Sequence, residues 1–310
     1  MKRVALLGAS GFVGGAVREA LESSAEVVAV PAPRLSSPAR SVADVGAQVR
    51  GHGAVSDLVK AFAGVEVVVN AAGNPDASSL DEDALFGANA VLPALVMEAA
   101  SLAGVRRVVH VSSAVVQNDK PVLDDSEDLR PFSPYSASKV LGEIVVRESP
   151  ASVERVRYRP PSVHAPQRRV TRMIRRIATS PAATVASPGD QLTPQALLPN
   201  VAAAVAELAV REGAVPAVVH HPSEGVTVTS LMTDLSGGRR PRRIPRVLAR
   251  GIVALAKRVG RLHRPTAANA RRVELLWLGQ EQAESWLTAQ GWSVPVGHEG
   301  WQALASEEER

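Results

Sequence analysis

Short continuous runs of apolar residues alternate, along the first half of the chain, with longer segments in which apolar residues recur every three or four positions. The continuous runs are rich in valine and occupy residues 4–7, 27–30, 65–69, 108–111 and 153–158. The periodic segments between them occupy residues 13–21, 56–62, 81–103 and 135–148. Buried strands that alternate with helices predict βαβ units and a parallel sheet, which right-handed crossovers make doubly wound. The pattern therefore predicts a Rossmann-type α/β fold.

This alternation stops after Pro161. Helical periodicity returns over residues 168–178, 200–210 and 246–259, and pieces rich in proline and glycine separate these segments. We therefore predict a core domain over residues 1–165. Residues 166–310 are predicted to form mainly a smaller, mostly helical lobe, from which some strands return to the core.

Composition narrows the class of protein. Of the 310 residues, 45% are hydrophobic, 21% are charged and only 3% are aromatic, so a globular core must consist mostly of Val, Ala and Leu. The absence of cysteine excludes disulfides, thiolate catalysis and cysteine-ligated metals. The histidines, including the adjacent His220 and His221, lack the spacing of a ligand set, so no metal site is predicted.

The start of the chain and its apolar stretches bear on location. The apolar run that follows Met1-Lys2-Arg3 ends at Gly8 and is too short for a secretory signal. We find no stretch that approaches the roughly 18 apolar residues of a membrane span. The sequence therefore predicts a cytoplasmic protein with no membrane span.

Charge is divided unevenly. Residues 1–160 carry 16 Lys/Arg and 19 Asp/Glu, a net −3, whereas residues 161–310 carry 19 and 12, a net +7. Two arginine-rich segments, residues 168–176 and 239–243, contribute most of the excess. One interpretation is functional: the segments clamp a phosphate, or they contact an anionic carrier or a membrane surface. The other interpretation is that they are solvated faces of lobe helices. Few aromatic residues lie among these arginines, so no nucleic-acid partner is predicted.

A glycine-rich loop follows the first apolar run and precedes the first helix. Its glycines recur at three-residue steps, which lets the backbone turn tightly and approach a pyrophosphate at the helix N-terminus. This context predicts a dinucleotide site. The residues predicted to contact the cofactor are Gly8, Ser10, Gly11, Phe12, Val13 and Gly14.

The end of the second apolar run distinguishes the two nicotinamide cofactors. An acidic residue there holds a ribose 2′-hydroxyl, whereas an arginine accommodates a 2′-phosphate. Residues 29–37 contain no acid and one arginine, Arg34. We therefore predict NADP(H) as the preferred cofactor, with Arg34 on the phosphate and Ser36 or Ser37 assisting. NAD(H) is the alternative cofactor, with Arg34 then a surface residue.

Tyr135 and Lys139 are four residues apart in a segment with helical periodicity. Positions i and i+4 share a helix face, so the ammonium would favour the phenolate and lower the tyrosine pKa from about 10. Such a phenol exchanges a proton with a carbinol or carbonyl oxygen near neutral pH. The spacing alone occurs often in amphipathic helices, but behind a phosphate-binding loop it indicates redox chemistry.

The glycine loop and the Tyr/Lys segment occur together with four further motifs. With these motifs the chain resembles the extended short-chain dehydrogenases/reductases of the epimerase/dehydratase-like branch along nearly its full length. The motifs are Asn70-Ala71-Ala72-Gly73, Gly87-Ala88-Asn89-Ala90-Val91, Val111-Ser112-Ser113-Ala114 and Arg159-Pro160-Pro161-Ser162-Val163, beside the Tyr/Lys segment Ser133–Glu143. The resemblance implies that the core binds a dinucleotide and that the lobe binds a small-molecule substrate. It also implies a homodimer through residues 81–103 and 135–148.

The resemblance implies a role for each catalytic position. Tyr135 would be the general acid or base, and Lys139 would lower its pKa and hold the nicotinamide ribose. Ser113 would bind the substrate carbonyl oxygen, with Ser112 as the alternative, and Asn89 would support a water-linked proton path. A purely structural role is the alternative for these residues: Tyr135 as a packed aromatic, Ser113 as a strand end and Asn89 as a polar helix residue. The remaining implied cofactor contacts are Ala71, Ala72, Gly73, Lys139, Pro160 and Val163.

Two departures from the family pattern concern the adenine contact and the reaction. His52 lies near the position of an aspartate that contacts adenine, and it either takes that role or faces solvent. Ala114-Val115 replaces the Asp-Glu of 4,6-dehydratases, which argues against dehydration. The sequence is interpreted as an NADPH-dependent ketoreductase acting on a deoxysugar nucleotide or a lipophilic, polyketide-type ketone. The alternatives are a nucleotide-sugar epimerase that retains NAD and a non-catalytic NADP-binding regulator.

Overall fold

The chain divides into two compact units in the computed structural model, which describes residues 1–260 and 264–306. The first unit contains residues 1–118, 125–160 and 201–221, and the second contains 119–124, 161–200 and 222–310. Apart from residues 119–124, the first unit therefore runs from the start of the chain to Pro160, and a helix–strand segment at residues 201–221 is added to it later in the chain. Residues 201–210, which the sequence assigned to the lobe, are part of this first unit.

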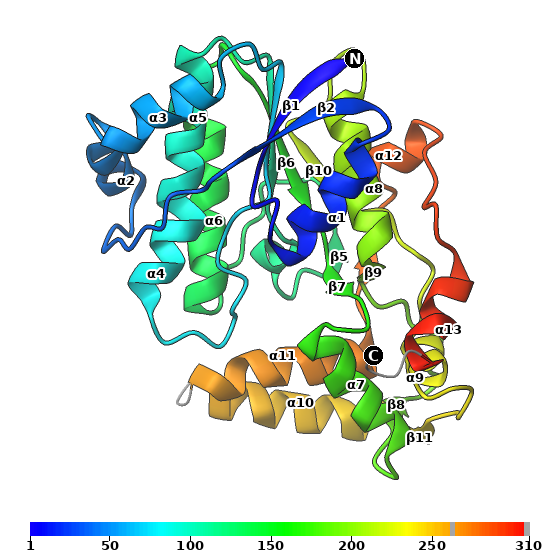
Figure 1. The fold of residues 1–310 in the computed structure, drawn as a ribbon. Coiled ribbons are helices and arrows are strands. Elements are labelled where there is room, and N and C mark those ends of the chain that lie inside the picture. The colour runs from blue at the N-terminus through cyan, green and yellow to red at the C-terminus, as the bar shows by residue number, and fades with distance from the viewer. Residues whose placement is uncertain (261–263, 307–310) are drawn as a thin grey trace. The chain divides into compact units, whose positions relative to one another are not determined.

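A six-stranded parallel sheet forms the centre of the first unit (Figure 1). Its strand order is β2-β1-β3-β4-β6-β10, with bounds Ala25–Val30, Lys2–Leu7, Val67–Asn70, Arg107–Val111, Glu154–Arg159 and Val218–His220. The chain leaves β1 for β2 at one edge and then crosses back to β3 on the other side of β1. This reversal creates a crevice at the carboxyl ends of β1 and β3, where ligands bind in open α/β sheets. The predicted doubly wound Rossmann-type fold is confirmed.

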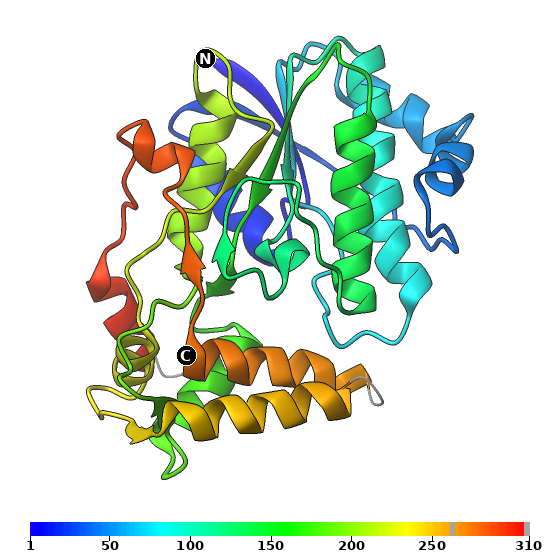
Figure 2. The ribbon, with the colours of Figure 1, turned by 180° about the vertical axis from the view of Figure 1, so that it is seen from behind.

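Helices cover both faces of this sheet, as Figures 1 and 2 show. One face carries α1 (Phe12–Leu21) and α8 (Leu198–Val210), and the other carries α3 (Gly53–Ala61), α5 (Leu92–Leu102) and α6 (Pro134–Glu148). Because both faces are covered, strand residues such as Val4–Leu7 and Val67–Val69 are fully buried. This double burial explains the continuous valine-rich runs of the sequence.

The helix predicted over residues 81–103 is interrupted. It consists of α4 (Glu82–Phe86), a π-helical turn at Gly87–Val91 and α5. The combined 21 residues Glu82–Leu102 are long and apolar enough to cross a membrane, which the sequence analysis did not recognise. Burial of 72% of the apolar window gives this helix the character of a core helix. The π-helical turn carries Asn89, and such turns are frequent at functional sites.

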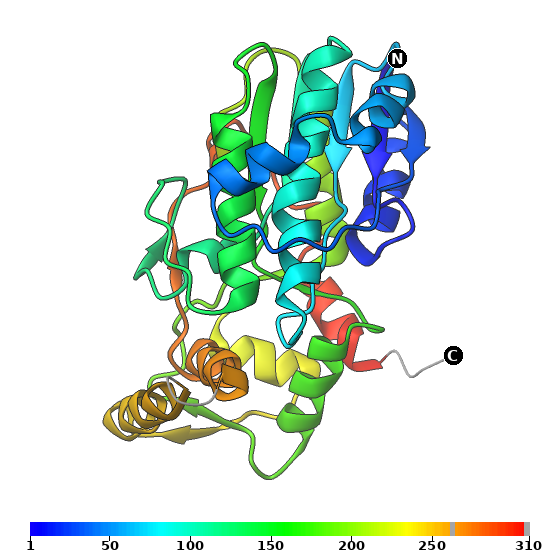
Figure 3. The ribbon, with the colours of Figure 1, turned by 90° about the vertical axis from the view of Figure 1, so that its left-hand side faces the viewer.

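The sequence analysis did not predict α2 (Val42–Val49). A capping box starts this helix, because the Ser41 hydroxyl accepts from the Asp44 amide and the Asp44 carboxylate accepts from the Ser41 amide. The helix contacts α5 and α6, and Figure 3 shows it crossing their outer side. Val45 and Val49 are buried there. Part of the α5–α6 face is therefore covered by the chain itself.

The second unit is mostly helical, as predicted. Its helices are α7 (Arg169–Thr179), α9 (Val228–Leu235), α10 (Arg246–Gly260), α11 (Arg264–Leu278), α12 (Trp286–Ala289) and α13 (His298–Ser306). Three small parallel pairs of strands, which the sequence did not predict, join them: β7 (Ser162–His164) with β9 (Gln195–Leu197), β8 (Thr184–Ala186) with β11 (Arg242–Ile244), and β5 (Val122–Leu123) with β12 (Glu281–Gln282). Leu231 and Trp301 lie in its apolar core.

The contact between α6 and the π-helical turn gives a test of the packing. A Cβ placed on Gly142 would lie 2.0 Å from the Asn89 carbonyl oxygen, so the helices must separate in Gly142→Ala. We expect a loss of about 2 kcal/mol in the free energy of unfolding, measured by urea denaturation. Gly46→Ala is the matched control: in α2 only the end of the Arg50 side chain is near, and stability should be unchanged or higher. Equal stability of the two variants would contradict this packing.

Candidate active site

The glycine loop lies against the segment that follows β3. Gly8 has φ +83°, and a Cβ there would lie 2.7 Å from the Ala72 amide nitrogen. At Gly14 a Cβ would lie 2.0 Å from the Gly8 carbonyl oxygen. Gly11 is the N-cap of α1 and provides no side-chain hydrogen bond to the first turn. The loop thus forms a close backbone surface at a helix N-terminus, which suits the pyrophosphate of a dinucleotide.

The loop after β2 presents one of the two predicted serines. Arg34 and Ser36 are exposed, whereas Ser37 is buried and donates to Gln48 Oε1 at 2.7 Å. The hydroxyl of Ser37 is therefore used inside the protein, and Arg34 and Ser36 are the side chains accessible to a phosphate. The backbone at residues 35–36 is close to Gly87, where a Cβ would lie 2.3 Å from the Leu35 carbonyl oxygen.

Arg40 holds the same loop in place, and the sequence analysis assigned it no role. Its guanidinium lies 2.7 Å from Asp83 Oδ1 and 4.1 Å from the centre of the Phe86 ring. It also donates to the Ser37 carbonyl oxygen at 2.9 Å. These contacts tie residues 37–40 to α4, so the Arg34 loop starts and ends on ordered elements.

Tyr135 and Lys139 lie one turn apart in α6, which begins with Pro134 after a capping box of Ser133 and Ser136. Lys139 is 6% exposed, and its ammonium donates to the Val111 carbonyl oxygen at 3.5 Å. Burial lowers the pKa of Lys139 to about 8, and the Glu143 carboxylate counteracts part of that effect. A cation is thus held at the carboxyl end of β4, on the helix face shared with the half-buried Tyr135.

Asn89 connects the loop after β3 to α6. Its Oδ1 accepts from the Asn74 amide at 2.9 Å, and its Nδ2 donates to the Asn74 carbonyl oxygen and to Ser138 Oγ, both at 3.0 Å. Gly73 lies beside it: a Cβ there would be 2.8 Å from Asn89 Oδ1 and 3.4 Å from Lys139 Nζ. The predicted residues Gly73, Asn89 and Lys139 are therefore brought together, although they are distant in sequence.

The two serines after β4 have different environments. Ser112 is 4% exposed and donates to Glu143 Oε1 at 2.6 Å. Ser113 is half-buried, and its hydroxyl oxygen accepts from the Val115 amide at 3.2 Å. Ala114 donates its amide to the Pro160 carbonyl oxygen at 2.8 Å, so Pro160 borders the same strand end. The Ser112 hydroxyl is committed to the interior, which favours Ser113 for contact with a substrate.

A buried ion pair lies behind these serines. Glu143 and Arg159 have fully buried side chains and are joined at 2.6 Å between Nη2 and Oε2 and at 2.9 Å between Nε and Oε1. Since Ser112 also donates to Glu143, the carboxylate is well satisfied, as a buried charge requires. Both residues lie in motifs of the sequence, but neither was predicted to have a role. Their pairing was not visible because 16 residues separate them.

His52 and Val163 were also predicted to lie at the site, whereas His110 was not. His52 caps α3 by accepting from the Ala54 amide at 3.2 Å, which is a structural role. Val163 is in β7, a strand of the second unit. His110 is fully buried, and burial, together with the charges of Lys139 and Arg157, lowers its pKa to about 3. It is therefore neutral at physiological pH and adds no second positive charge beside Lys139.

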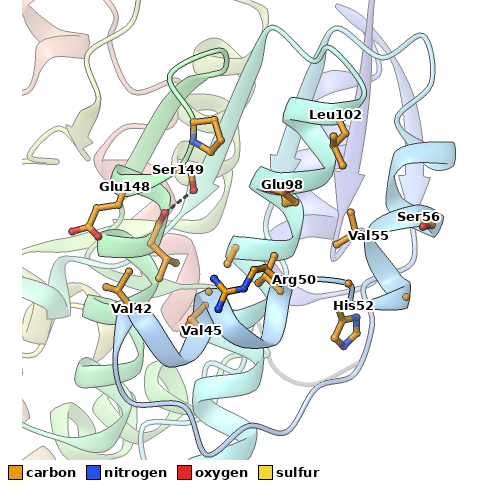
Figure 4. A pocket seen from close by; sticks show the side chains of 17 residues that line it. Val42, Val45, Arg50, His52, Val55, Ser56, Glu98, Leu102, Glu148 and Ser149 are labelled. Carbon is orange, nitrogen blue, oxygen red and sulfur yellow. Dashed lines mark hydrogen bonds between the residues drawn. The ribbon is translucent and has the colours of Figure 1, made fainter.

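A cavity of about 430 Å³ lies among α2, α3, α5 and α6 (Figure 4). Its lining includes Val45, Val49 and Val145, and the polar side chains of Arg50 and His52 also line it. None of the predicted catalytic side chains lines it. Within residues 1–260 and 264–306, no group of three or more His, Asp or Glu side chains has the arrangement of a metal site.

The sequence matches one protein-family model over more than half of its length. Residues 4–216 match the model of the NAD dependent epimerase/dehydratase family. Over 84 residues the chain is 42% identical to UDP-glucose 4-epimerase of Mycolicibacterium smegmatis. This aligned segment covers 26% of this chain and 27% of that protein. The chain therefore matches about a quarter of the length of this curated relative.

Solved structures with similar folds are more distant in sequence. A dTDP-4-dehydrorhamnose reductase from Bacillus anthracis, in complex with NADP, has a TM-score of 0.64 and 16% identity, with 100% of both chains covered. A human epimerase family protein with NADPH has a TM-score of 0.67 and 17% identity, with 99% of this chain and 100% of that chain covered. At these identities the likeness establishes the fold.

The buried ammonium predicts a specific pH dependence of stability. The folded-state pKa of Lys139 is about 8 against 10.5 ordinarily, so between these values the unfolded state binds more protons and stability rises with pH. Lys139→Met should abolish this rise, which we expect to be on the order of 2 kcal/mol in the free energy of unfolding. The measurement is urea denaturation from pH 7.5 to 10.5, with the exposed Lys60→Met as control. A constant difference between wild type and Lys139→Met would refute the burial of the charge.

Proposed function

Because the chain belongs to the NAD dependent epimerase/dehydratase family, we propose that it is an NADPH-dependent ketoreductase that reduces a carbonyl of a small or medium organic substrate. One observation carries the proposal: the buried Lys139 ammonium lies one helical turn from Tyr135 and beside Gly73, at the strand ends that the glycine loop also borders. A phenol, a cation and a phosphate-binding loop at one crevice suit proton-coupled redox chemistry.

When bound, the nicotinamide cofactor supplies the hydride. The residues that would hold it are the glycine loop on the pyrophosphate, Ala71-Ala72-Gly73 along its path and Lys139 on the nicotinamide ribose. Pro160 and Val163 are proposed to meet the nicotinamide end. The close backbone contacts at Gly8 and Gly14, which leave no space for a Cβ, support this use of the loop.

The proton is proposed to come from the Tyr135 hydroxyl. Lys139 favours the phenolate that remains, because a buried cation interacts with a nearby anion more strongly than an exposed one does. Ser113 would donate to the substrate carbonyl oxygen and stabilise the negative charge that develops there. Asn89 is proposed to hold the loop at residues 73–74 so that a water-linked path can return a proton beneath Lys139.

The cofactor and the substrate class are further parts of the proposal. Exposed Arg34, with no acid at the end of β2, favours NADP(H) and hence a reductase that consumes its cofactor. A deoxysugar nucleotide or a lipophilic, polyketide-type ketone is the proposed substrate, and the second unit is the proposed substrate lobe. NAD(H) is the alternative cofactor.

A nucleotide-sugar epimerase is the second candidate, favoured by the 42% identity to UDP-glucose 4-epimerase over 84 residues. An epimerase oxidises and re-reduces the same carbon, so it should purify with retained NAD and need none added. A ketoreductase should instead bind NADPH reversibly and oxidise one molecule for each carbonyl reduced. Absorbance of the purified protein at the dinucleotide wavelengths, followed by NADPH consumption with added ketones, separates the two.

A cytoplasmic location and a homodimer complete the proposal. A dimer that used α5 and α6 would have to include α2, because Val45 and Val49 of α2 are already buried among them. Sedimentation velocity would establish the oligomeric state of the full chain.

Removal of the phenol hydroxyl tests the catalytic role of Tyr135. We expect Tyr135→Phe to lower kcat at least about 100-fold, because the proton donor is lost, while the Kd of NADPH stays close to that of wild type. The assay is NADPH oxidation with a panel of nucleotide-linked 4-keto sugars and alkyl ketones. Tyr158→Phe is the matched control, since Tyr158 is the only other tyrosine, is buried and contacts His221 Nδ1 at 2.6 Å. Full activity of Tyr135→Phe would exclude this mechanism.

Removal of the Arg34 charge tests cofactor selection without a substrate. Arg34→Ala should raise the Kd of NADPH about 10-fold or more, because a charge-assisted contact to the 2′-phosphate is lost, and should leave the Kd of NADH unchanged. Fluorescence titration measures both constants. Arg50→Ala removes another exposed arginine of the first unit and serves as the control. Tighter binding of NADH than NADPH by wild type would discard the NADP(H) assignment.

A further inference from the structure

The helix α10 buries its small side chains and exposes its large apolar ones. On its inward face Ala249 is 0% exposed and Val253 is 3% exposed. On the outward face Leu248 is 53%, Ile252 42% and Leu255 64% exposed. A surface helix of a soluble domain normally shows the opposite arrangement, with its larger apolar residues toward the core. The outward face of α10 therefore suits contact with an apolar environment other than the core of the protein.

These exposed residues form one stripe. Leu248, Ile252, Leu255 and Val259 follow the spacing i, i+4, i+7 and i+11, and Val247, 83% exposed, lies beside the start of the stripe. Of the ten large hydrophobic residues that are exposed in the described part of the chain, five are on this 15-residue helix. Single exposed apolar residues are ordinary on protein surfaces, but a contiguous stripe of them marks an interaction surface.

The chain around the stripe is exclusively basic in its charges. No Asp or Glu occurs between Asp234 and Glu274, whereas this stretch has twelve Lys and Arg residues. Arg250 and Arg258 are exposed on α10, and Arg242 and Arg243 are exposed on β11, which directly precedes the helix. Within residues 1–260 and 264–306 these four arginines have no acidic partner.

Lys257 shows that pairing is available where the helix faces its own unit. Its ammonium lies 2.8 Å from Glu274 Oε1 on α11 and 3.5 Å from Asp119 Oδ2. Arg258 lies beside the apolar stripe, whereas Arg250 lies on the same side of the helix as Lys257 but has no acidic partner in the described residues. Apolar side chains flanked by unpaired cations are complementary to a surface that has an apolar interior and an anionic boundary.

We propose that α10 docks this protein on the surface of an anionic phospholipid bilayer. The helix would lie in the plane of the interface, with Leu248, Ile252, Leu255 and Val259 at the acyl boundary and the arginines on lipid phosphates. A nucleic acid would engage the cations but would have no use for the apolar stripe. A second copy of the chain would bring two basic surfaces together, which like-charge repulsion opposes. The bilayer satisfies both features.

Vesicle co-sedimentation with the full chain tests the proposal. Wild type should bind phosphatidylcholine vesicles that contain about one-third phosphatidylglycerol at least about 10-fold more tightly than pure phosphatidylcholine vesicles, and high salt should weaken binding. Leu248→Ser/Leu255→Ser should bind anionic vesicles at least about 10-fold more weakly. Arg250→Gln/Arg258→Gln should bind anionic vesicles several-fold more weakly and show a smaller salt dependence.

Leu102→Ser is the matched control, because Leu102 is a leucine with the same 64% exposure but lies on α5 of the first unit. It should bind vesicles as wild type does. Titration with NADPH checks that each variant is folded and separates this test from that of the proposed activity. Equal binding to neutral and anionic vesicles, or unchanged binding by the double leucine variant, would overturn the proposal. So would a dimer, formed without lipid, that the double leucine variant dissociates.

Discussion

The burial of one ammonium group determines how the rest of the candidate site is arranged. Lys139 is a cation with 6% exposure, and its desolvation must be offset by contacts that only the folded chain provides. The Val111 carbonyl oxygen and the nearby Glu143 carboxylate provide them. Since β4 and α6 each contribute one of these partners, the position of α6 over the sheet and the chemistry of Lys139 depend on each other.

Close backbone packing provides the second constraint. Gly8, Gly14, Gly73 and Gly142 each lie where a Cβ would approach another atom to 2.8 Å or less. Three of these contacts involve the glycine loop or the loop after β3, and the fourth joins α6 to the turn that carries Asn89. The absence of side chains at these positions lets four segments converge at the carboxyl ends of β1, β3 and β4. Convergence of this kind places backbone amides and the Lys139 ammonium at these strand ends, one helical turn from Tyr135.

The two units differ in where their charged side chains lie and in whether these side chains are paired. In the first unit, Glu143 satisfies Arg159 and Ser112 together, so buried charge is balanced by specific partners. In the second unit, arginines near α10 remain on the surface beside exposed leucines. The first arrangement fixes the positions of the side chains behind the candidate catalytic residues. The second leaves exposed leucines and arginines available for the bilayer contact that we propose.

The sequence by itself determined the elements whose signals are local. Strands buried on both faces appear as valine runs, and the glycine steps and the Tyr/Lys spacing each lie within one short segment, so all were predictable. Tertiary structure alone decided the features that join distant residues: the pairing of Glu143 with Arg159, the burial of Ser37, the π-helical turn at Asn89 and the position of α2 over α5 and α6. The assignment of residues 201–221 to the first unit rather than to the lobe was likewise decided by tertiary contacts, among them the pairing of β10 with β6. These depend on which surfaces meet, and the energy of burying a side chain is set by partners far away in the chain.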